Sequence, residues 1–145
     1  MKEDAERDLV DVLTAEHRAV ERLFADVETT SDRALRREML AAALAELRRL
    51  SAMEERFLYP ATREHIPSGE VLAAHELREH AEANAKMRRL ARLDDSDPEY
   101  ERLVSSLFTD IRDHVTEEET ELFPRLRAAC DAETLRRLGS DAAGT

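Results

Sequence analysis

Glycine and proline are scarce in this sequence and tryptophan is absent: the 145 residues include three glycines and four prolines. Because glycine and proline break regular helices and form turns, their scarcity excludes a fold of many short strands and tight turns. Alanine, leucine, glutamate and arginine are abundant instead, and these residues favour helix. The sequence therefore predicts an all-α protein, and its length predicts one domain over residues 1–145.

Cysteine occurs once, as Cys130, so an internal disulfide is excluded and a reducing compartment, the cytoplasm, is expected. No apolar run approaches the roughly 18 residues of a transmembrane helix, and no signal peptide is expected. Lysine and arginine number 22 against 33 acidic residues, which gives a formal net charge of −11. Partners that need a basic face, namely nucleic acids and anionic membranes, are therefore not expected.

Apolar residues recur at helical spacing in long segments that are separated by turn residues. The predicted helices run over about 4–28, 32–65, 70–93 and 98–128, followed by a short helix over 131–138 and a frayed tail over 139–145. Gly139 is expected to end the short helix, and Pro60 and Pro124 are expected to kink theirs. Short turns make successive helices antiparallel, so the sequence predicts an up-down-up-down four-helix bundle with a core over about residues 8–128.

One segment combines two metal-binding residue types: His114-Val-Thr-Glu-Glu118. Residues four apart share a helix face, about 5–6 Å apart at Cβ, so an imidazole and a carboxylate here can hold a metal ion. The segment has an earlier counterpart, Leu50-Ser-Ala-Met-Glu54, and in both copies a second glutamate and then a Leu-aromatic-Pro sequence follow. The counterpart has Leu50 where the later copy has His114.

Two more histidines interrupt apolar stripes, His17 on the first predicted helix and His80 on the third. His17 precedes Pro60 by 43 residues and His80 precedes Pro124 by 44, so the chain resembles two copies of a helical hairpin. A rough two-fold relation would bring one set of polar residues to a single level of the core: His17, Glu54, His80, His114 and Glu118.

Two buried carboxylates at one level repel each other, and each costs several kcal/mol to bury unpaired. Only the peripheral Arg125 supplies a cation on these stripes, so a divalent or trivalent metal ion is the simplest compensation. A cluster of mutually hydrogen-bonded histidines and glutamates is the alternative. Mixed imidazole and carboxylate ligands suit iron, manganese or zinc, and two carboxylates able to bridge favour a dinuclear centre.

The order of these residues, with the Leu-Tyr-Pro and Leu-Phe-Pro sequences behind the glutamates, resembles a bacterial hemerythrin-like (HHE cation-binding) domain over about residues 8–128. Five of the six ligand positions of the family pattern match. The resemblance implies a non-heme di-iron centre within a four-helix bundle. It also implies that Glu54 and Glu118 bridge the irons, that His17 holds one iron, and that His80 and His114 hold the other.

Leu50 is the departure, because the family pattern has a histidine at that position. His65 and His75 are expected at the surface, and Tyr59 is expected to point about 140° away from Glu54 on a regular helix, unless the kink at Pro60 turns it. Glu76, one turn before His80, is a further candidate ligand. A dinuclear centre with an open position, a mononuclear or partly loaded site, and a vestigial site therefore all remain open.

The function expected from this resemblance is that of an iron protein which binds or reacts with O2, NO or H2O2, including decomposition of peroxide. The alternative is a non-catalytic protein for oxygen or iron sensing, storage or delivery. No catalytic residues are assigned, because Ser51 and Cys130 have no histidine at helical spacing that would activate them. The sequence does not indicate whether the protein has a protein partner.

Overall fold

The computed structural model describes residues 6–145, and no strand occurs within that range. Its elements in chain order are α1 (Leu9–Thr29), α2 (Arg33–Met53), the π-helix η2 (Glu54–Leu58), α3 (Tyr59–His65), α4 (Gly69–Arg92), α5 (Pro98–Glu117), the π-helix η3 (Glu118–Leu122), α6 (Phe123–Ala129) and α7 (Ala132–Ala143).

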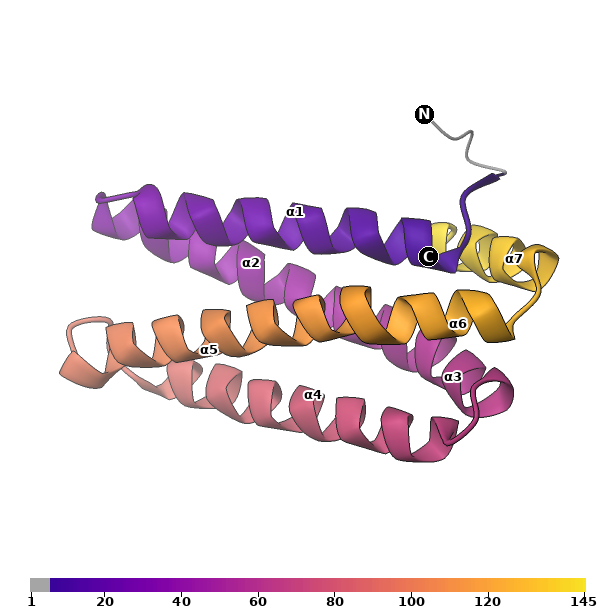
Figure 1. The fold of residues 1–145 in the computed structure, drawn as a ribbon. Helices are drawn as coiled ribbons and strands as arrows, with labels where there is room; N and C mark the ends of the chain where they lie inside the picture. The colour runs from indigo at the N-terminus through magenta and orange to yellow at the C-terminus, as the bar shows by residue number, and fades with distance from the viewer. Residues whose placement is uncertain (1–5) are drawn as a thin grey trace.

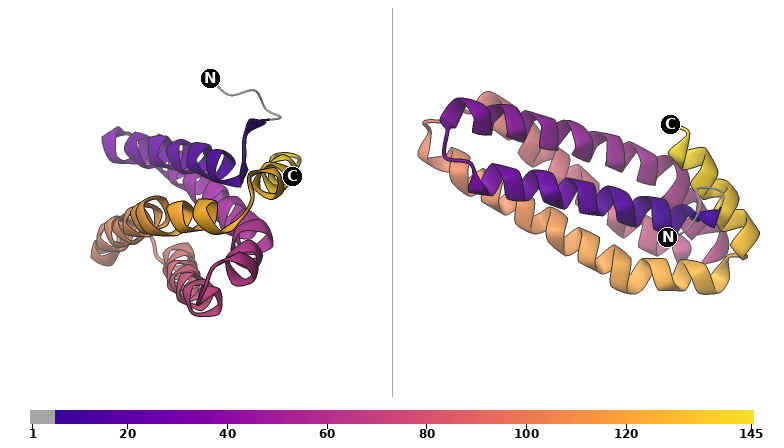
Figure 2. Two further views of the ribbon diagram at one scale, coloured as in Figure 1. Left: turned by 45° about the vertical axis from the view of Figure 1, so that its right-hand side comes forward. Right: turned by 90° about the horizontal axis from the view of Figure 1, so that it is seen from above.

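Two of the four bundle helices are composite. Segments α2, η2 and α3 follow one another without interruption, as do α5, η3 and α6, and each set forms one long rod (Figure 1). These rods pack with α1 and α4 as an antiparallel bundle whose connections alternate between its two ends (Figure 2). The predicted up-down-up-down four-helix bundle is thereby confirmed.

Helix α1 begins later than the predicted start near residue 4, a position that lies outside the described residues. The Asp8 side chain accepts a hydrogen bond from the Asp11 N–H at 2.8 Å, and the Asp11 side chain accepts one from the Asp8 N–H at 3.0 Å. This reciprocal capping box satisfies N–H groups that the first helical turn leaves free, so it fixes the helix start at Leu9.

The predicted turn between the second and third bundle helices is present at residues 66–68. Gly69 begins α4 so close to α3 that an added Cβ would lie 2.0 Å from the carbonyl oxygen of Thr62. Only glycine fits such an approach of two backbones. The close packing holds the start of α4, and with it the histidine-bearing face of that helix, firmly against the first composite rod.

The prediction that Gly139 ends a short helix and precedes a frayed tail is wrong. Helix α7 runs through this residue to Ala143, and Ala142 is fully buried. A Cβ on Gly139 would lie 2.5 Å from the carbonyl carbon of Asp8, so glycine here permits α7 to pack against the chain just before α1. Gly139, which the sequence pattern indicated as a helix end, instead allows close packing within a continuous helix.

The core is a continuous set of leucine, valine, phenylalanine and alanine side chains along the bundle axis. Among the described residues, no helix is long and apolar enough to cross a membrane. Buried polar and charged side chains interrupt this apolar core; apart from Thr62, which lies near the end of α3, they gather in one cluster: His17, Glu54, Glu76, His80, His114 and Glu118.

Candidate metal centre

The five side chains predicted to meet in the core do meet there. All are nearly or completely buried, with exposed fractions of 6% or less: His17, Glu54, His80, His114 and Glu118. They come from all four bundle helices, with α1 and α4 giving one histidine each and the two composite rods giving the rest. The bundle therefore brings together residues that lie up to 101 positions apart in the chain.

Each of the two buried glutamates points its two oxygens at different histidines. Glu54 Oε2 lies 3.3 Å from His17 Nε2, and Glu54 Oε1 lies 3.1 Å from His80 Nε2. Glu118 Oε1 lies 3.2 Å from His17 Nε2, and Glu118 Oε2 lies 3.3 Å from His114 Nε2. Both carboxylates thus stand between a one-histidine side and a two-histidine side.

The π-helical segments begin at these two glutamates. The Tyr59 N–H donates to the Glu54 carbonyl, and the Phe123 N–H donates to the Glu118 carbonyl, each spanning five residues instead of four. A π-turn contains one extra residue, so positions five apart come to the same side of the helix. Prolines 60 and 124 follow directly, and since proline disfavours regular helix just before it, the wider turn has a local cause in the sequence.

Tyr59 points into the centre, so the orientation expected on a regular helix is wrong and the alternative, a turn of the chain near Pro60, is the one present. Its hydroxyl donates a hydrogen bond to Glu118 Oε2 at 2.9 Å and lies 3.0 Å from His80 Nε2 and 3.5 Å from Glu54 Oε1. The prediction assumed regular α-helical geometry, which the π-turn replaces. Burial and the charges of nearby carboxylates raise the pKa of Tyr59, so its phenol keeps its proton and donates it.

Outer carboxylates face the second ring nitrogen of each histidine. His17 Nδ1 lies 2.8 Å from Glu119 Oε2, and His80 Nδ1 lies 3.6 Å from Glu55 Oε2. The His17 contact is a hydrogen bond that fixes the ring orientation and leaves Nε2 free to act as a metal ligand, whereas the Glu55 contact is a longer ion pair and His80 Nδ1 has no hydrogen-bond partner. Glu55 and Glu119 occupy equivalent places in the two copies of the repeat. The second glutamate of each Glu-Glu pair in the sequence therefore marks a carboxylate that faces a histidine Nδ1.

Glu76, the further candidate ligand, lies behind His114. Its Oε2 is 2.9 Å from His114 Nδ1, whereas Glu118 approaches the other ring nitrogen, Nε2. The same His114 nitrogen lies 3.0 Å from Glu79 Oε1, a contact that no sequence pattern indicated. Glu76 also has an oxygen within 4.8 Å of ligand atoms of His114 and Glu118, which places it at the edge of the centre.

Without a bound metal ion, protons on the histidines would balance the charge of the two buried carboxylates. Burial lowers the pKa of His17, but hydrogen bonds with Glu118 and Glu54 outweigh it and raise that pKa to about 10. A similar balance raises the pKa values of His80 and His114. Burial raises the pKa of Glu54, yet contacts with the three histidines hold it well below its usual range. Burial and the charge of Glu54 raise the pKa of Glu118 to about 7.

The donor set fits a metal. Two groups of three buried ligands, each with its ligand atoms within 4.8 Å of one another, share Glu54: one joins it to His80 and His114, and the other joins it to His17 and Glu118. His114 Nε2 and Glu118 Oε1 are fully buried without a hydrogen-bond partner. Buried polar atoms are nearly always hydrogen-bonded, so these two unpaired atoms, which lie on the His114 side and the His17 side of Glu118, are consistent with a site for a cation.

A cavity of about 110 Å³ adjoins the centre between α2, α4 and α5. Apolar side chains form much of its wall: Leu47, Leu50, Ala83, Met87 and Ile111. His17, Glu54, His80 and His114 also border it. Leu50, which stands where the repeat predicts a histidine, therefore forms part of the wall beside the one-histidine side of the centre.

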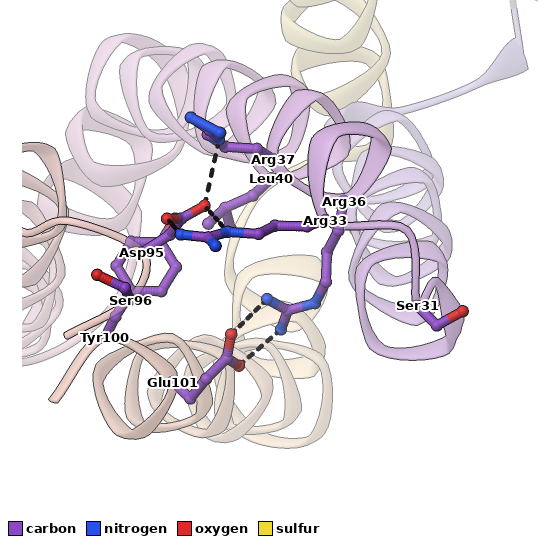
Figure 3. A pocket seen from close by; sticks show the side chains of 9 residues that line it. All are labelled: Ser31, Arg33, Arg36, Arg37, Leu40, Asp95, Ser96, Tyr100 and Glu101. Atoms are coloured by element: carbon purple, nitrogen blue, oxygen red, sulfur yellow. Dashed lines mark hydrogen bonds and ion pairs between the residues drawn. The ribbon is translucent and has the colours of Figure 1, made fainter. Parts of the chain in front are cut away.

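A larger hollow of about 460 Å³ lies near the starts of α2 and α5, away from the centre (Figure 3). Its guanidinium groups are already paired: Arg33 and Arg37 contact Asp95, and Arg36 binds Glu101 with two hydrogen bonds (Figure 3). Each of the three guanidinium groups is already held by a carboxylate, with Asp95 shared by Arg33 and Arg37, so none is free to bind a ligand in this hollow.

Comparisons with known proteins agree with this geometry. The sequence matches the family model of the Hemerythrin HHE cation binding domain over residues 8–126. The solved structure of a Hemerythrin HHE cation binding domain-containing protein from Mycobacterium kansasii is similar, with a TM-score of 0.81 at 25% identity; the match covers 95% of this chain and 84% of that one.

A curated protein described as a DNA nickase, from Nostoc sp. (strain PCC 7120), is also similar, at 26% identity over 117 residues. The match covers 81% of this chain but 33% of that protein, so this chain spans about a third of the relative's length. The family match itself extends over most of the chain, and it ends within a few residues of the predicted core. This chain therefore belongs to the hemerythrin HHE cation-binding domain family.

Proposed function

We propose that the bundle core holds two iron ions bridged by Glu54 and Glu118, and that this centre binds or reacts with a small uncharged ligand: O2, NO or H2O2. The observation that supports this proposal is the orientation of the two carboxylates. Each directs one oxygen to His17 and the other to the side of His80 and His114. A carboxylate that served a single ion would not need its second oxygen buried against a histidine on the opposite side.

The proposed ligand residues divide into two unequal sets. His80 and His114 would hold one ion and His17 the other, with both carboxylates shared. When bound, an iron pair supplies electron transfer to or from a small ligand. The half around His17 lacks the second histidine that the repeat predicts at Leu50, and Leu50 forms part of the cavity wall instead.

The size and lining of the cavity favour a small ligand. Its volume of about 110 Å³ is well below the ~300–1,000 Å³ of pockets that bind organic molecules. Its inner wall is largely apolar, while Glu82 and Asp113 also border it. These carboxylates disfavour entry of anions and leave neutral molecules unaffected. The cavity therefore suits a diatomic gas or hydrogen peroxide better than an organic substrate.

Two aromatic residues complete the surroundings. The Tyr59 hydroxyl holds a proton at hydrogen-bond distance from Glu118 Oε2, within the centre itself. The Phe123 ring stacks on His17 with 5.7 Å between ring centroids, and it covers that ligand with an apolar surface. Together they limit the access of water and provide one positioned proton donor.

Metal content and visible absorption test the proposal. The purified protein, loaded anaerobically with iron and freed of excess metal, is expected to contain about two irons per chain and to show the absorption bands of a bridged di-iron centre on oxidation. About one iron without those bands would support a mononuclear site. Protein that retains no iron after loading would refute the proposal and leave a vestigial site.

Exposure to ligands then separates an enzyme from a carrier or sensor. Oxygen evolution on addition of H2O2, over many turnovers, would show catalysis. Reversible spectral changes with O2 or NO and no turnover would instead support the non-catalytic alternative in sensing, storage or delivery. Nicking of DNA is not proposed for this chain, because a formal net charge of −11 opposes binding to phosphates.

A further inference from the structure

A second group of metal-ligating side chains lies on the outer side of His114. It consists of His75, Glu76 and Glu79 from α4 and Glu117 from the end of α5. One ligand atom of each lies within 4.8 Å of the others, close to the spacing of ligands around a single first-row metal ion. The side chains of His75, Glu79 and Glu117 are 30–44% exposed, so a cation reaches them from solvent.

Too few hydrogen-bond donors serve the three carboxylates of this group. His75 Nε2 lies 3.0 Å from Glu117 Oε1 and 3.4 Å from Glu79 Oε1, and one ring nitrogen carries one hydrogen. Among residues 6–145, no ion pair joins a lysine or arginine to any of these three glutamates. By contrast, Glu21 and Glu28 on α1 both form ion pairs with an arginine, Arg112.

Glu76 gives an independent indication of a missing cation. It is 3% exposed, and its Oε2 is fully buried and accepts no hydrogen bond. His114 Nδ1 lies 2.9 Å away, but the hydrogen of that nitrogen is directed to Glu79 Oε1 at 3.0 Å. The ring of His114 lies beside this oxygen without donating to it, so a cation bound by the outer group would supply the contact that the oxygen lacks.

From this geometry we infer that His75, Glu76, Glu79 and Glu117 form an outer binding site for one divalent transition-metal ion. One imidazole and three carboxylates suit Fe²⁺, Mn²⁺ or Zn²⁺. Because Glu76 also approaches His114 and Glu118, the outer site lies between solvent and the buried centre and stages metal ions on their way into the core. Metal binding at the outer site does not depend on which ligand the core reacts with.

Titration of the metal-free protein with Mn²⁺, followed by the electron paramagnetic resonance of the free ion, tests the site. Wild-type protein is expected to bind one more Mn²⁺ per chain than His75→Ala or Glu117→Gln. The control variant His65→Ala removes another partly exposed histidine, paired with Glu64 at 3.8 Å, and should keep the wild-type number. Equal numbers in wild type and both site variants would overturn the proposal.

Two further measurements give the result a location and a role. Anomalous diffraction from Mn²⁺-soaked crystals is expected to show a peak between His75 and Glu117, and peaks confined to the core would contradict the outer site.

In stopped-flow loading with Fe²⁺, Glu117→Gln should fill the core about tenfold more slowly, because local negative charge concentrates cations. An unchanged loading rate would rule out the staging role. Circular dichroism of each variant checks that these exposed substitutions leave the fold intact.

Discussion

At the scale of single residues, Leu50 makes the two halves of the centre unequal. It lies one helical turn before Glu54, as His114 lies one turn before Glu118, and it is 4% exposed in the cavity wall. A leucine there packs well and leaves the fold intact, but it gives no lone pair to a metal ion. The half of the centre around His17 is therefore expected to bind its ion more weakly than the half around His80.

Replacing Leu50 by histidine should strengthen the weaker half. The new imidazole would stand on the same face as Glu54, one turn away, and should raise the metal content towards two ions per chain, as measured by elemental analysis after dialysis. Leu47→His is the matched control: it introduces the same side chain into the same cavity wall, but another turn further from Glu54. An unchanged metal content in Leu50→His would show that Leu50 does not limit occupancy.

Tyr59 is the second residue whose single functional group can be tested. Tyr59→Phe removes the hydroxyl that donates to Glu118 Oε2 at 2.9 Å inside a buried cluster. A buried hydrogen bond to a charged group contributes about 1.5–3 kcal/mol, so the free energy of unfolding of the metal-free protein should fall by about that amount. Urea denaturation would measure the change.

Tyr100→Phe provides the comparison for this prediction. Tyr100 is 7% exposed, and no hydrogen bond from its hydroxyl is present among the described residues. Its replacement should change the free energy of unfolding by less than about 0.5 kcal/mol, as is usual away from specific interactions. Equal effects of the two substitutions would mean that the Tyr59 hydroxyl has no special energetic role in the cluster.

At the scale of elements, the two π-helical segments are the distinctive feature. Both begin at a buried glutamate of the centre and both bring the residue five positions later, Tyr59 or Phe123, against a buried histidine of the other repeat copy. Tyr59 contacts His80 edge to face, while Phe123 stacks on His17. Each π-turn therefore places one aromatic ring against a histidine of the centre, and the two halves of the chain do this in the same way.

Deletion of one exposed residue tests the role of a π-turn. A π-turn equals an α-helix with one inserted residue, so removing Thr120 from η3 should restore a regular helix and keep both flanking faces in register. The variant is expected to fold with wild-type helix content by circular dichroism. It should bind metal about tenfold or more weakly, because the surroundings of Glu118 would change.

Deletion of Thr109 is the control, since this exposed threonine lies in the regular helix α5. It would rotate all later residues of the composite rod by about 100° and turn His114 and Glu118 away from the core. This variant should fail to fold. If deletion of Thr120 proves as disruptive as deletion of Thr109, the extra residue of η3 is not the local insertion inferred here.

The packing of α7 gives another test among the elements. Gly139→Ala would place a Cβ 2.5 Å from the backbone of Asp8, where no flexible side chain can yield. Overpacking of this kind costs about 1–3 kcal/mol, and the melting temperature should fall accordingly. Gly144→Ala adds the same methyl group where the nearest atoms are 3.5 Å away and should leave the melting temperature unchanged.

At the scale of the whole molecule, the bundle and the five core residues followed from the sequence because both rest on periodicity. Helical spacing and a hairpin repeated after about 64 residues place His17, Glu54 and His80 together without further information. The inward turn of Tyr59 did not follow, since a π-turn changes which residues share a face. Glu79 did not follow either, because its contact with His114 depends on how α4 packs on α5, for which no local pattern exists.

The charge balance of the whole cluster determines how it responds to pH. In the metal-free protein the pKa of His17 is about 10 and that of Glu118 about 7, both above the values near 6.5 and 4.5 expected for the unfolded chain. The folded state therefore holds more protons than the unfolded state. This contribution to stability is complete below the unfolded pKa values and is lost as the pH rises through about 7 for Glu118 and about 10 for His17.

Metal ions and protons should consequently compete for the same core. A ligand nitrogen must lose its proton to bind metal, so loading at pH 7 is expected to release protons, and metal affinity should rise by about tenfold per pH unit for each proton displaced. A pH indicator in weakly buffered solution would count the protons released per ion. His17→Ala should release fewer protons than wild type, and His65→Ala the same number. Metal binding without proton release would contradict the raised pKa of His17 and mean that the core is neutral before it meets its metal.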